Sequence, residues 1–467
     1  MFRLDAVNRN ALLVGRVDVP YSIPGLNPLI FYGMLVVIAV AAIPFGTVEP
    51  WWVAAFEVSV FALASLGAIE FCFSSSTTIS TGKYVLLWPL MGIVILAGVQ
   101  ILRLENTARS ISFDPHETDR FIFKFVALIL TGSLLLSHIQ TRSRLRALVN
   151  VVITIGALSG LFGLIRATTS GINIVNEEAT TGFAQFINRN HFAFLAEMSF
   201  GLALGLLVGG KLRRQPFVMY SLAVVIIWVA IIASLSRGGL FSMMSQVGFM
   251  LLLIGSKRMQ QFSEASKHHG ARHSWLLRLA LGAGVMIAIF VAVIWIGGEP
   301  LSQRLQQETM TRELHASAGQ PTSRIRRIDI WRATVRMVND HPIVGVGFGG
   351  YWLAIPQYLS YSGKREVHQA HNDYLEILAS GGVIGGALVA CFAWLLIRRA
   401  RRHFFSSDPL RRAACLGALT GIFGVAVHSV FDFGLHVTIN ALVFVSLVVI
   451  ATAELRKKQE NSVVRAE

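Results

Sequence analysis

Long apolar segments recur along the whole chain and are separated by mostly short polar connections. Each is close to the roughly 20 residues that an α-helix needs to cross a hydrocarbon core about 30 Å thick. A segment inside lipid must satisfy its own backbone hydrogen bonds, which favours helices. The pattern predicts an all-α polytopic membrane protein with about 12 transmembrane helices. The expected spans are 29–48, 51–73, 84–102, 121–139, 147–166, 191–210, 216–235, 239–255, 275–297, 374–397, 412–431 and 434–453.

Composition supports a membrane protein and limits its partners. Hydrophobic residues make up 54% of the chain and charged residues only 14%. The formal net charge of +15 would suit a nucleic-acid partner, but Lys and Arg are spread over connections between the expected spans. That distribution is typical of membrane topology and argues against nucleic-acid binding. Cys72, Cys391 and Cys415 lie in or beside apolar segments without metal-ligand spacing, so we expect no metal, disulfide framework or cofactor.

The basic residues also predict an orientation. They concentrate in both terminal tails and in the alternate connections 140–146, 211–216, 256–274 and 398–411. Cytoplasmic connections carry such an excess, so both termini should be cytoplasmic. The long polar interval 298–373 would then lie in the periplasm of a bacterial inner membrane. We expect no cleavable signal peptide, because the N-terminal segment lacks a short apolar run followed by a cleavage site.

The 298–373 interval has a helical pattern of its own. Residues 324–339 predict an amphipathic helix that ends at His341 and Pro342. A second short helix lying on the membrane is expected around 356–359. The predicted apolar face of the helix at 324–339 consists of Ile325, Ile328, Val335 and Val338. The expected organisation is a tail (1–28), spans one to nine (29–297), the periplasmic loop (298–373), spans ten to twelve (374–453) and a second tail (454–467).

Ionisable residues gather where this loop meets the tenth span. His371 precedes a helix whose first turn is acidic, with Asp373 and Glu376, as helix N-termini prefer. A histidine at a membrane surface can accept a proton from an attacking hydroxyl. An interfacial histidine that only caps or packs would explain the pattern as well. His368, one helical turn earlier, is the competing residue of the same type.

Arginines are expected on the same side. Arg237 lies in a tight connection between two apolar spans, beside Gly238 and Gly239, which permit close backbone approach. Arg324 and Arg327 belong to a cluster at the start of the amphipathic helix. A guanidinium fork matches two phosphate oxygens, so these residues could bind a pyrophosphate or lipid headgroups. The alternatives are a snorkelling side chain and a solvated basic face.

Two further segments carry a weaker signal. Residues 345–350 match G-x-G-x-x-G by letter, but no strand and no βαβ unit surround them, so a glycine-rich turn is favoured over a dinucleotide site. Polar residues, Asn188 and Asn190 among them, crowd the outer end of the sixth span. They could line a site or cap the helix.

At these motifs the chain resembles the bacterial O-antigen ligase family. That family includes O-antigen ligases and related O-antigen and exopolysaccharide polymerases. The matching motifs lie in order over roughly residues 180–400. They are Asn188-x-Asn190, Ser236 to Gly239, Ser323-Arg324, Asp340 to Gly347 and Ala370 to Glu376.

The resemblance implies a C-type membrane glycosyltransferase with a large periplasmic loop. Its donor would be a glycan on undecaprenyl pyrophosphate, and its acceptor lipid A–core or another lipid-linked glycan. It implies neither nucleotide sugar nor metal, and direct displacement would invert the anomeric carbon. Arg237 and Arg324 would hold the donor pyrophosphate, and His371 would be the base. We expect further substrate contacts from Asn188, Asn190, Arg327, His368 and Glu376.

Two alternatives remain open. A ligase transfers the glycan to lipid A–core, whereas a polymerase transfers it to another lipid-linked unit, and the motifs do not separate the two. A secondary transporter would place ionisable residues near the bilayer midplane, often in repeated halves, and no such halves are evident. Glu57, Lys124 and Glu197 lie inside expected spans without an explanation, although Glu197 could line the catalytic cavity.

Overall fold

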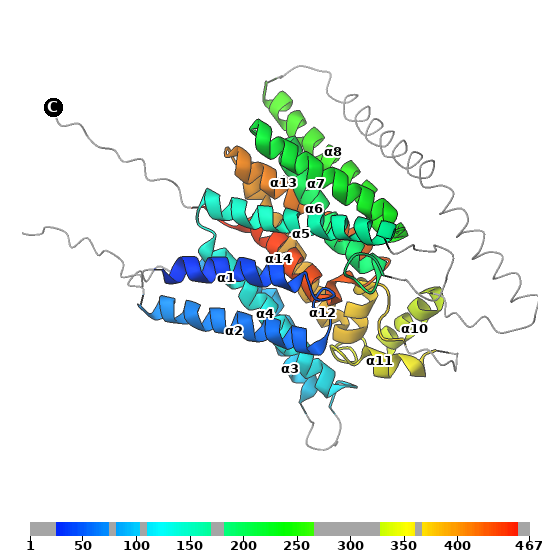
Figure 1. Ribbon diagram of the computed structural model, residues 1–467. Coiled ribbons are helices and arrows are strands. Elements are labelled where there is room, and N and C mark those ends of the chain that lie inside the picture. Colours follow the sequence, from blue (N-terminus) through cyan, green and yellow to red (C-terminus); the bar gives the residue numbers. More distant parts are fainter. Residues whose placement is uncertain are drawn as a thin grey trace, which may run out of the picture.

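The computed structural model describes residues 25–73, 81–102, 110–169, 182–265, 327–359 and 367–455. Within these ranges the chain forms helices and turns, and no strand. The long helices are α1 (Leu26–Ala41), α2 (Pro50–Phe73), α3 (Trp88–Ile101), α4 (Pro115–His138), α5 (Arg142–Thr169), α6 (Arg189–Gly209), α7 (Arg214–Ala233), α8 (Arg237–Ala265), α12 (Asp373–Phe404), α13 (Pro409–His428) and α14 (Thr438–Thr452). The short ones are η1 (Thr81–Leu87), α10 (Arg327–Asp340), α11 (Tyr351–Ala354), η2 (Ile355–Gln357) and η3 (Gly434–His436) (Figure 1).

The architecture confirms an all-α polytopic membrane protein. Among the described residues, nine helical segments are long and apolar enough to cross a membrane, and α1 and α14 are shorter apolar helices. Each expected span in the described ranges coincides with one of these helices. The expected span 275–297 and residues 298–326 of the expected loop lie outside the described residues. The total of about 12 spans and the division into domains stay predictions.

Two helix ends differ from the predicted spans for local reasons. The first helix ends at Ala41 rather than at residue 48, because the chain turns through positive φ at Phe45, Gly46 and Thr47. The fourth begins at Pro115 rather than at residue 121. Its start is fixed by the side chain of Asp114, which accepts the N–H groups of the first turn.

Helix α6 lies in the centre of the bundle, packed against α5, α7, α8 and α13 (Figure 1). Its closest neighbour is α13, because glycines face one another across the contact. A methyl group on Gly205 would collide with Cα of Gly417, and one on Gly201 would lie 2.6 Å from the backbone nitrogen of Gly421. Small residues allow this approach in a membrane, where packing rather than the hydrophobic effect joins helices.

Gly205→Ala is expected to lower the thermal stability of the purified protein. Overpacking typically costs about 1–3 kcal/mol, more than the roughly 0.5–1 kcal/mol by which Ala is preferred to Gly inside a helix. Gly98→Ala in α3 is the matched control, because a methyl group there meets nothing within 4 Å. Thermal unfolding in detergent should show a lower Tm for the first variant and an equal or higher Tm for the second. Equal melting of both variants would contradict close α6–α13 packing.

The two ends of the bundle differ in chemistry. Helices α6, α8, α12 and α14 begin, and α13 ends, at one end, which we call the site end. At the opposite end Arg142 pairs with Asp408 at 2.7 Å, and Arg399 pairs with Glu454 at 3.1 Å. The basic connections 140–146 and 398–411 thus lie together, away from the site end. This agrees with the predicted alternation of loops, while the assignment of sides stays a prediction.

Helix α12 is broken at Gly382, where φ is 61°, although the sequence predicted one continuous span. The turn after α10 fills the break. The carbonyl of Pro342 accepts the N–H of Val383 at 2.8 Å, and the N–H of Val346 reaches the carbonyl of Ala379 at 2.9 Å. Buried Gln100 adds a bond to the carbonyl of Ser380 at 2.8 Å. The backbone groups freed by the break are therefore satisfied, and the first turns of α12 are fixed in place.

The glycine-rich segment 345–350 forms the predicted turn. Gly345 and Gly347 have φ of 71° and 99°, which only glycine adopts readily. A methyl group on Gly345 would also meet the backbone of Ala379 at 2.5 Å. The turn therefore docks backbone to backbone against α12.

Helix α10 ends at Asp340, directly before His341 and Pro342, as predicted. Its predicted face was wrong at Ile328 and Val335, which are 43% and 45% exposed. Val338 is half-buried and packs against the core as predicted, and Ile325 lies outside the described residues. The buried face consists of Ile330, Ala333, Thr334 and Met337, which pack toward α12 and η2. The expected second short helix exists as α11 and η2, and it begins earlier, at Tyr351.

Candidate active site

His371 lies directly before α12. The side chain of Asn372 caps this helix by accepting the N–H of Leu375 at 3.0 Å. The predicted acidic first turn is present, with Asp373 and Glu376. His371 itself has φ of 50°, a left-handed conformation that is uncommon for a residue with a side chain.

A buried carboxylate holds the His371 ring. Its Nδ1 lies 3.1 Å from Oδ1 of Asp432, in the turn between α13 and α14. The Asp432 side chain is 1% exposed, and that of His371 is 32% exposed. An ionised carboxylate accepts hydrogen bonds, so it favours the proton on Nδ1 and leaves Nε2 as a proton acceptor. Phe433 meets the imidazole edge-on, with ring centroids 4.8 Å apart. This is the arrangement of a base oriented by an acid.

Asp432 has several donors around it. Asn190 and Arg327 donate to its Oδ2, the latter at 3.4 Å, and the N–H of Phe433 donates to Oδ1 at 3.0 Å. Burial alone would raise the pKa of Asp432. The hydrogen bond from His371, the charges of Arg327 and His371, and the bond from Asn190 outweigh it and lower that pKa to about 2. The carboxylate therefore stays ionised at neutral pH and continues to orient His371.

A hydrogen-bond chain brings the start of α8 to the same place. Ser236 Oγ donates to Asn190 Oδ1 at 2.8 Å, and the Asn190 amide donates to Asp432. Arg237 is the next residue and the first of α8, and its side chain is exposed. A methyl group on Gly238 would lie 2.5 Å from the His428 ring, so the glycine lets α8 approach α13. These hydrogen bonds therefore fix the position of the Arg237 backbone relative to His371.

Glu376 lies beneath the His371 segment rather than on its surface. Its carboxylate accepts the backbone N–H of Ala370 at 2.8 Å and contacts His436 Nε2 at 3.1 Å. The residue is 7% exposed. Protein groups therefore contact both of its oxygens, and its predicted contact with substrate stays a prediction.

The structure brings His371, Asn190 and Arg327 together around Asp432. Asn188 is the N-cap of α6, and its Oδ1 accepts the N–H of Asn190 at 2.9 Å. Asn188 therefore caps the helix, and Asn190 contributes to the site. His368 is exposed and stacks on Trp352, with centroids 5.8 Å apart. Arg324 lies outside the described residues.

Sequence reasoning missed Asp432 and His436. Both lie in a short connection between two apolar spans, and that connection carries none of the motifs. The available signal was charge spacing: His428, Asp432 and His436 follow one another every four residues at the end of the bundle that carries His371.

Glu197 lies inside the bundle, and a place in the lining of the catalytic site stays a prediction. It is fully buried, and its Oε2 pairs with His428 Nδ1 at 3.0 Å. His428 stacks on Phe194, with ring centroids 4.1 Å apart. The pair joins α6 to α13 one turn before Asp432.

No residues are assigned to a metal. Within the described ranges, no cluster of three His, Cys, Asp or Glu side chains could hold an ion. Asp373 and Glu376 instead face His436, at 3.9 and 3.1 Å. Independence from metal stays a prediction.

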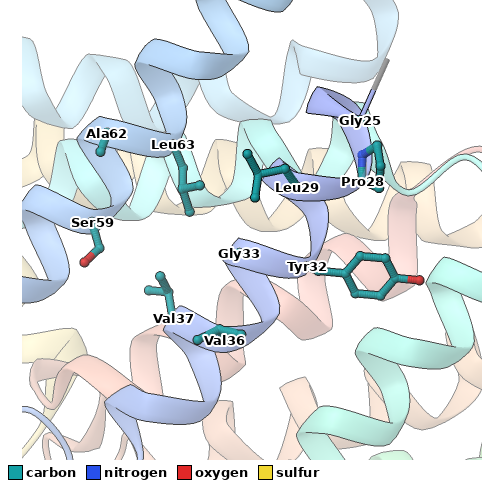
Figure 2. A pocket seen from close by; sticks show the side chains of 10 residues that line it. All are labelled: Gly25, Pro28, Leu29, Tyr32, Gly33, Val36, Val37, Ser59, Ala62 and Leu63. Carbon is teal, nitrogen blue, oxygen red and sulfur yellow. The ribbon is translucent and has the colours of Figure 1, made fainter. Parts of the chain in front are cut away.

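A groove of about 750 Å³ lies elsewhere, between α1 and α2 (Figure 2). Its lining is apolar or small apart from Tyr32 and Ser59, and no carboxylate, imidazole or guanidinium belongs to that lining. Leu29 and Val36, which line it, are more than half exposed. The groove is therefore an apolar surface feature, separate from the His371 site.

Residues 222–390 match the family model described as O-antigen ligase. The O-antigen ligase segment runs from α7 to the middle of α12 and includes Arg237, Arg327 and His371, whereas Asn190 and Asp432 lie outside it. No curated protein matches the chain.

The match to the O-antigen ligase family model supports a membrane glycosyltransferase of the ligase or polymerase type, acting on lipid-linked glycans. It agrees with the many apolar helices and favours an enzyme over the transporter alternative. An enzyme of this type needs a base for an incoming hydroxyl and positive charge for a leaving group. His371 and the arginines at the site end are groups of those kinds.

Proposed function

We propose that the protein transfers a glycan from undecaprenyl pyrophosphate to a hydroxyl of lipid A–core, with His371 as the base. The observation that carries this proposal is the His371–Asp432 pair at the end of the O-antigen ligase segment. The site lies at one end of a bundle of apolar helices, where a lipid-anchored donor can reach it from the bilayer. We place this end on the periplasmic side of the inner membrane, with both termini in the cytoplasm.

The proposed step is a direct displacement. The acceptor oxygen attacks the anomeric carbon while its proton passes to Nε2 of His371. The bond from the anomeric carbon to the pyrophosphate oxygen breaks, the lipid pyrophosphate leaves with the electron pair, and the configuration inverts. Negative charge develops on that leaving group, so fixed guanidinium groups stabilise the transition state more than the ground state. Asp432 stabilises the imidazolium that forms.

Arg237, Arg324 and Arg327 are the proposed pyrophosphate ligands. Arg237 begins α8 and Arg327 begins α10, and the start of a helix favours negative charge. Arg327 already pairs with Asp432, and its side chain is 48% exposed, so part of its fork is open to a ligand. Asn188, Asn190 and His368 are kept as proposed substrate contacts.

Arg237→Ala and Arg324→Ala are each expected to lower kcat/KM for the lipid-linked donor by about 10- to 100-fold. A hydrogen bond to a charged group is worth about 1.5–3 kcal/mol, and each 1.36 kcal/mol is a factor of ten. The acceptor KM should change by less than about twofold. Arg120→Ala is the matched control, because Arg120 forms an exposed pair with Glu117 near the same end of the bundle. Unchanged donor kinetics in both variants would contradict a pyrophosphate clamp.

Deletion of the gene tests the function as a whole. Loss of long-chain glycan from lipid A–core, with accumulation of lipid-linked polymer, is the expected result. Accumulation of single lipid-linked repeat units would identify the polymerase alternative. Unchanged surface polysaccharide and no accumulating intermediate would overturn both.

A further inference from the structure

The backbone of His371 needs support from its neighbours. A left-handed residue with a side chain persists only where surrounding contacts determine it. Both polar backbone groups of the preceding residue, Ala370, are held. Its N–H donates to Glu376 Oε2 at 2.8 Å, and its carbonyl accepts Nε1–H of Trp331 at 3.1 Å. Ala370 is fully buried, so these bonds form away from water.

Glu376 in turn depends on His436. A carboxylate that is 7% exposed is costly to bury unless a donor or a positive charge meets it. His436 Nε2 lies 3.1 Å from Glu376 Oε1 and 3.9 Å from Asp373 Oδ1. Loss of surrounding water would lower the pKa of His436, but the nearby Glu376 and Asp373 raise it above its usual value. The two carboxyl groups therefore favour the protonated form of the ring.

His436 is itself fixed from another helix. The ammonium group of Lys124, on α4, donates a hydrogen bond to the backbone carbonyl of His436 at 2.6 Å. Lys124, an ionisable residue that the sequence leaves without an explanation, is thereby connected to the turn at residues 429–437. That turn also carries Asp432, which holds the His371 ring.

We propose that His436 is a positioning residue that acts through Glu376 to hold His371 in its left-handed conformation. One turn then fixes the base twice: Asp432 fixes the ring nitrogen, and His436 fixes the backbone. Lys124 fixes the turn against α4. This inference rests on the proposed role of His371 as the base, and it adds a residue that contacts neither substrate nor the reacting atoms.

The kinetic test is His436→Gln in the full-length protein, assayed with a purified lipid-pyrophosphate-linked glycan. Misplacing a catalytic group by about 1 Å can cost about 100-fold, so kcat should fall by about 10- to 100-fold. The donor KM should stay within about twofold, because the arginines are untouched. His436→Lys restores a cationic donor to Glu376 and should recover part of kcat. His116→Gln, an exposed histidine at the start of α4, is the matched control and should resemble the wild type.

Hydrogen exchange measures the support directly and needs no substrate. Peptides covering residues 367–372 should exchange faster in His436→Gln than in the wild type, while peptides from α6 remain unchanged. If His436→Gln does not fold, Lys124→Met serves in its place, with the same direction expected for kcat and for exchange.

The outcomes separate this inference from the proposed function. If the wild type is active and His436→Gln changes neither kcat nor hydrogen exchange, the positioning role is overturned and the proposed function is not. A fall in kcat that His436→Lys does not relieve, with equal loss of donor affinity, also overturns it, because that result reflects general disruption. A wild type inactive on every lipid-linked donor overturns the proposed function, while faster exchange at 367–372 would still support the contact between His436 and Glu376.

Discussion

His371→Ala is expected to lower the rate of glycan transfer by about 100- to 10,000-fold, the range that a positioned general base supplies. The acceptor hydroxyl is a poor nucleophile, and the geometry offers Nε2 of His371 as its proton acceptor, because Asp432 occupies Nδ1. Removal of the imidazole leaves the arginines in place. Donor KM should therefore change little, and nearly all of the loss should appear in kcat.

Backbone strain must be separated from loss of the ring. Alanine at φ of 50° is disfavoured, whereas glycine adopts that conformation freely. We therefore expect His371→Gly and His371→Ala to be equally inactive, with the glycine variant at least as stable as the alanine variant. His116→Ala is the control, and it should keep wild-type activity. Full transfer by either His371 variant, measured with purified lipid-linked donor, would exclude His371 as the base.

The membrane helices could be predicted well from the sequence because their signal is local. An apolar segment long enough to cross lipid must be helical whatever surrounds it. The ends of the helices were predicted less accurately, because capping residues and turns decide where a helix begins and ends. Asp114 caps α4, which begins at Pro115, six residues before the expected span does. The break at Gly382 depends on a turn about 40 residues earlier in the chain, which supplies the missing hydrogen-bond partners.

Helix α10 shows the limit of periodicity. The sequence predicted its place and its end, but it offers more than one apolar stripe. The chosen stripe, which includes Ile328 and Val335, is exposed, and packing against α12 selected the stripe with Ile330, Ala333 and Met337 instead. Which stripe is buried depends on where α12 lies, and helical spacing carries no such information.

The active site was predictable only where motifs marked it. His371, Arg237 and Asn190 stand in polar segments that are conspicuous between apolar spans. Asp432 comes to His371 from 61 residues away, through a turn with no distinctive composition. His436 and Lys124 meet only in the folded chain, since 312 residues separate them. Contacts of this kind follow from the arrangement of the helices, which local patterns do not determine.

Asp432→Asn is expected to reduce kcat by about 100- to 10,000-fold, because an Asn in place of an Asp that orients a catalytic His costs up to about 10⁴-fold in serine proteases. The carboxylate, with a pKa lowered to about 2, is ionised at every working pH and accepts the Nδ1 proton. An amide can instead donate to Nδ1, which moves the ring proton to Nε2 and removes the acceptor that the hydroxyl needs. Asp119→Asn, an exposed carboxylate of α4, is the control.

The decisive measurement is a double-mutant cycle with His371. If Asp432 acts through the ring, Asp432→Asn added to His371→Ala costs no further rate, because residues that act as a unit are not additive. Stability gives an independent check: the Asn variant loses the ion pair with Arg327, so its Tm should fall in both backgrounds. A further loss of rate in the double variant would show that Asp432 contributes separately, through Arg327 or Asn190, and would remove it from the role of orienting acid.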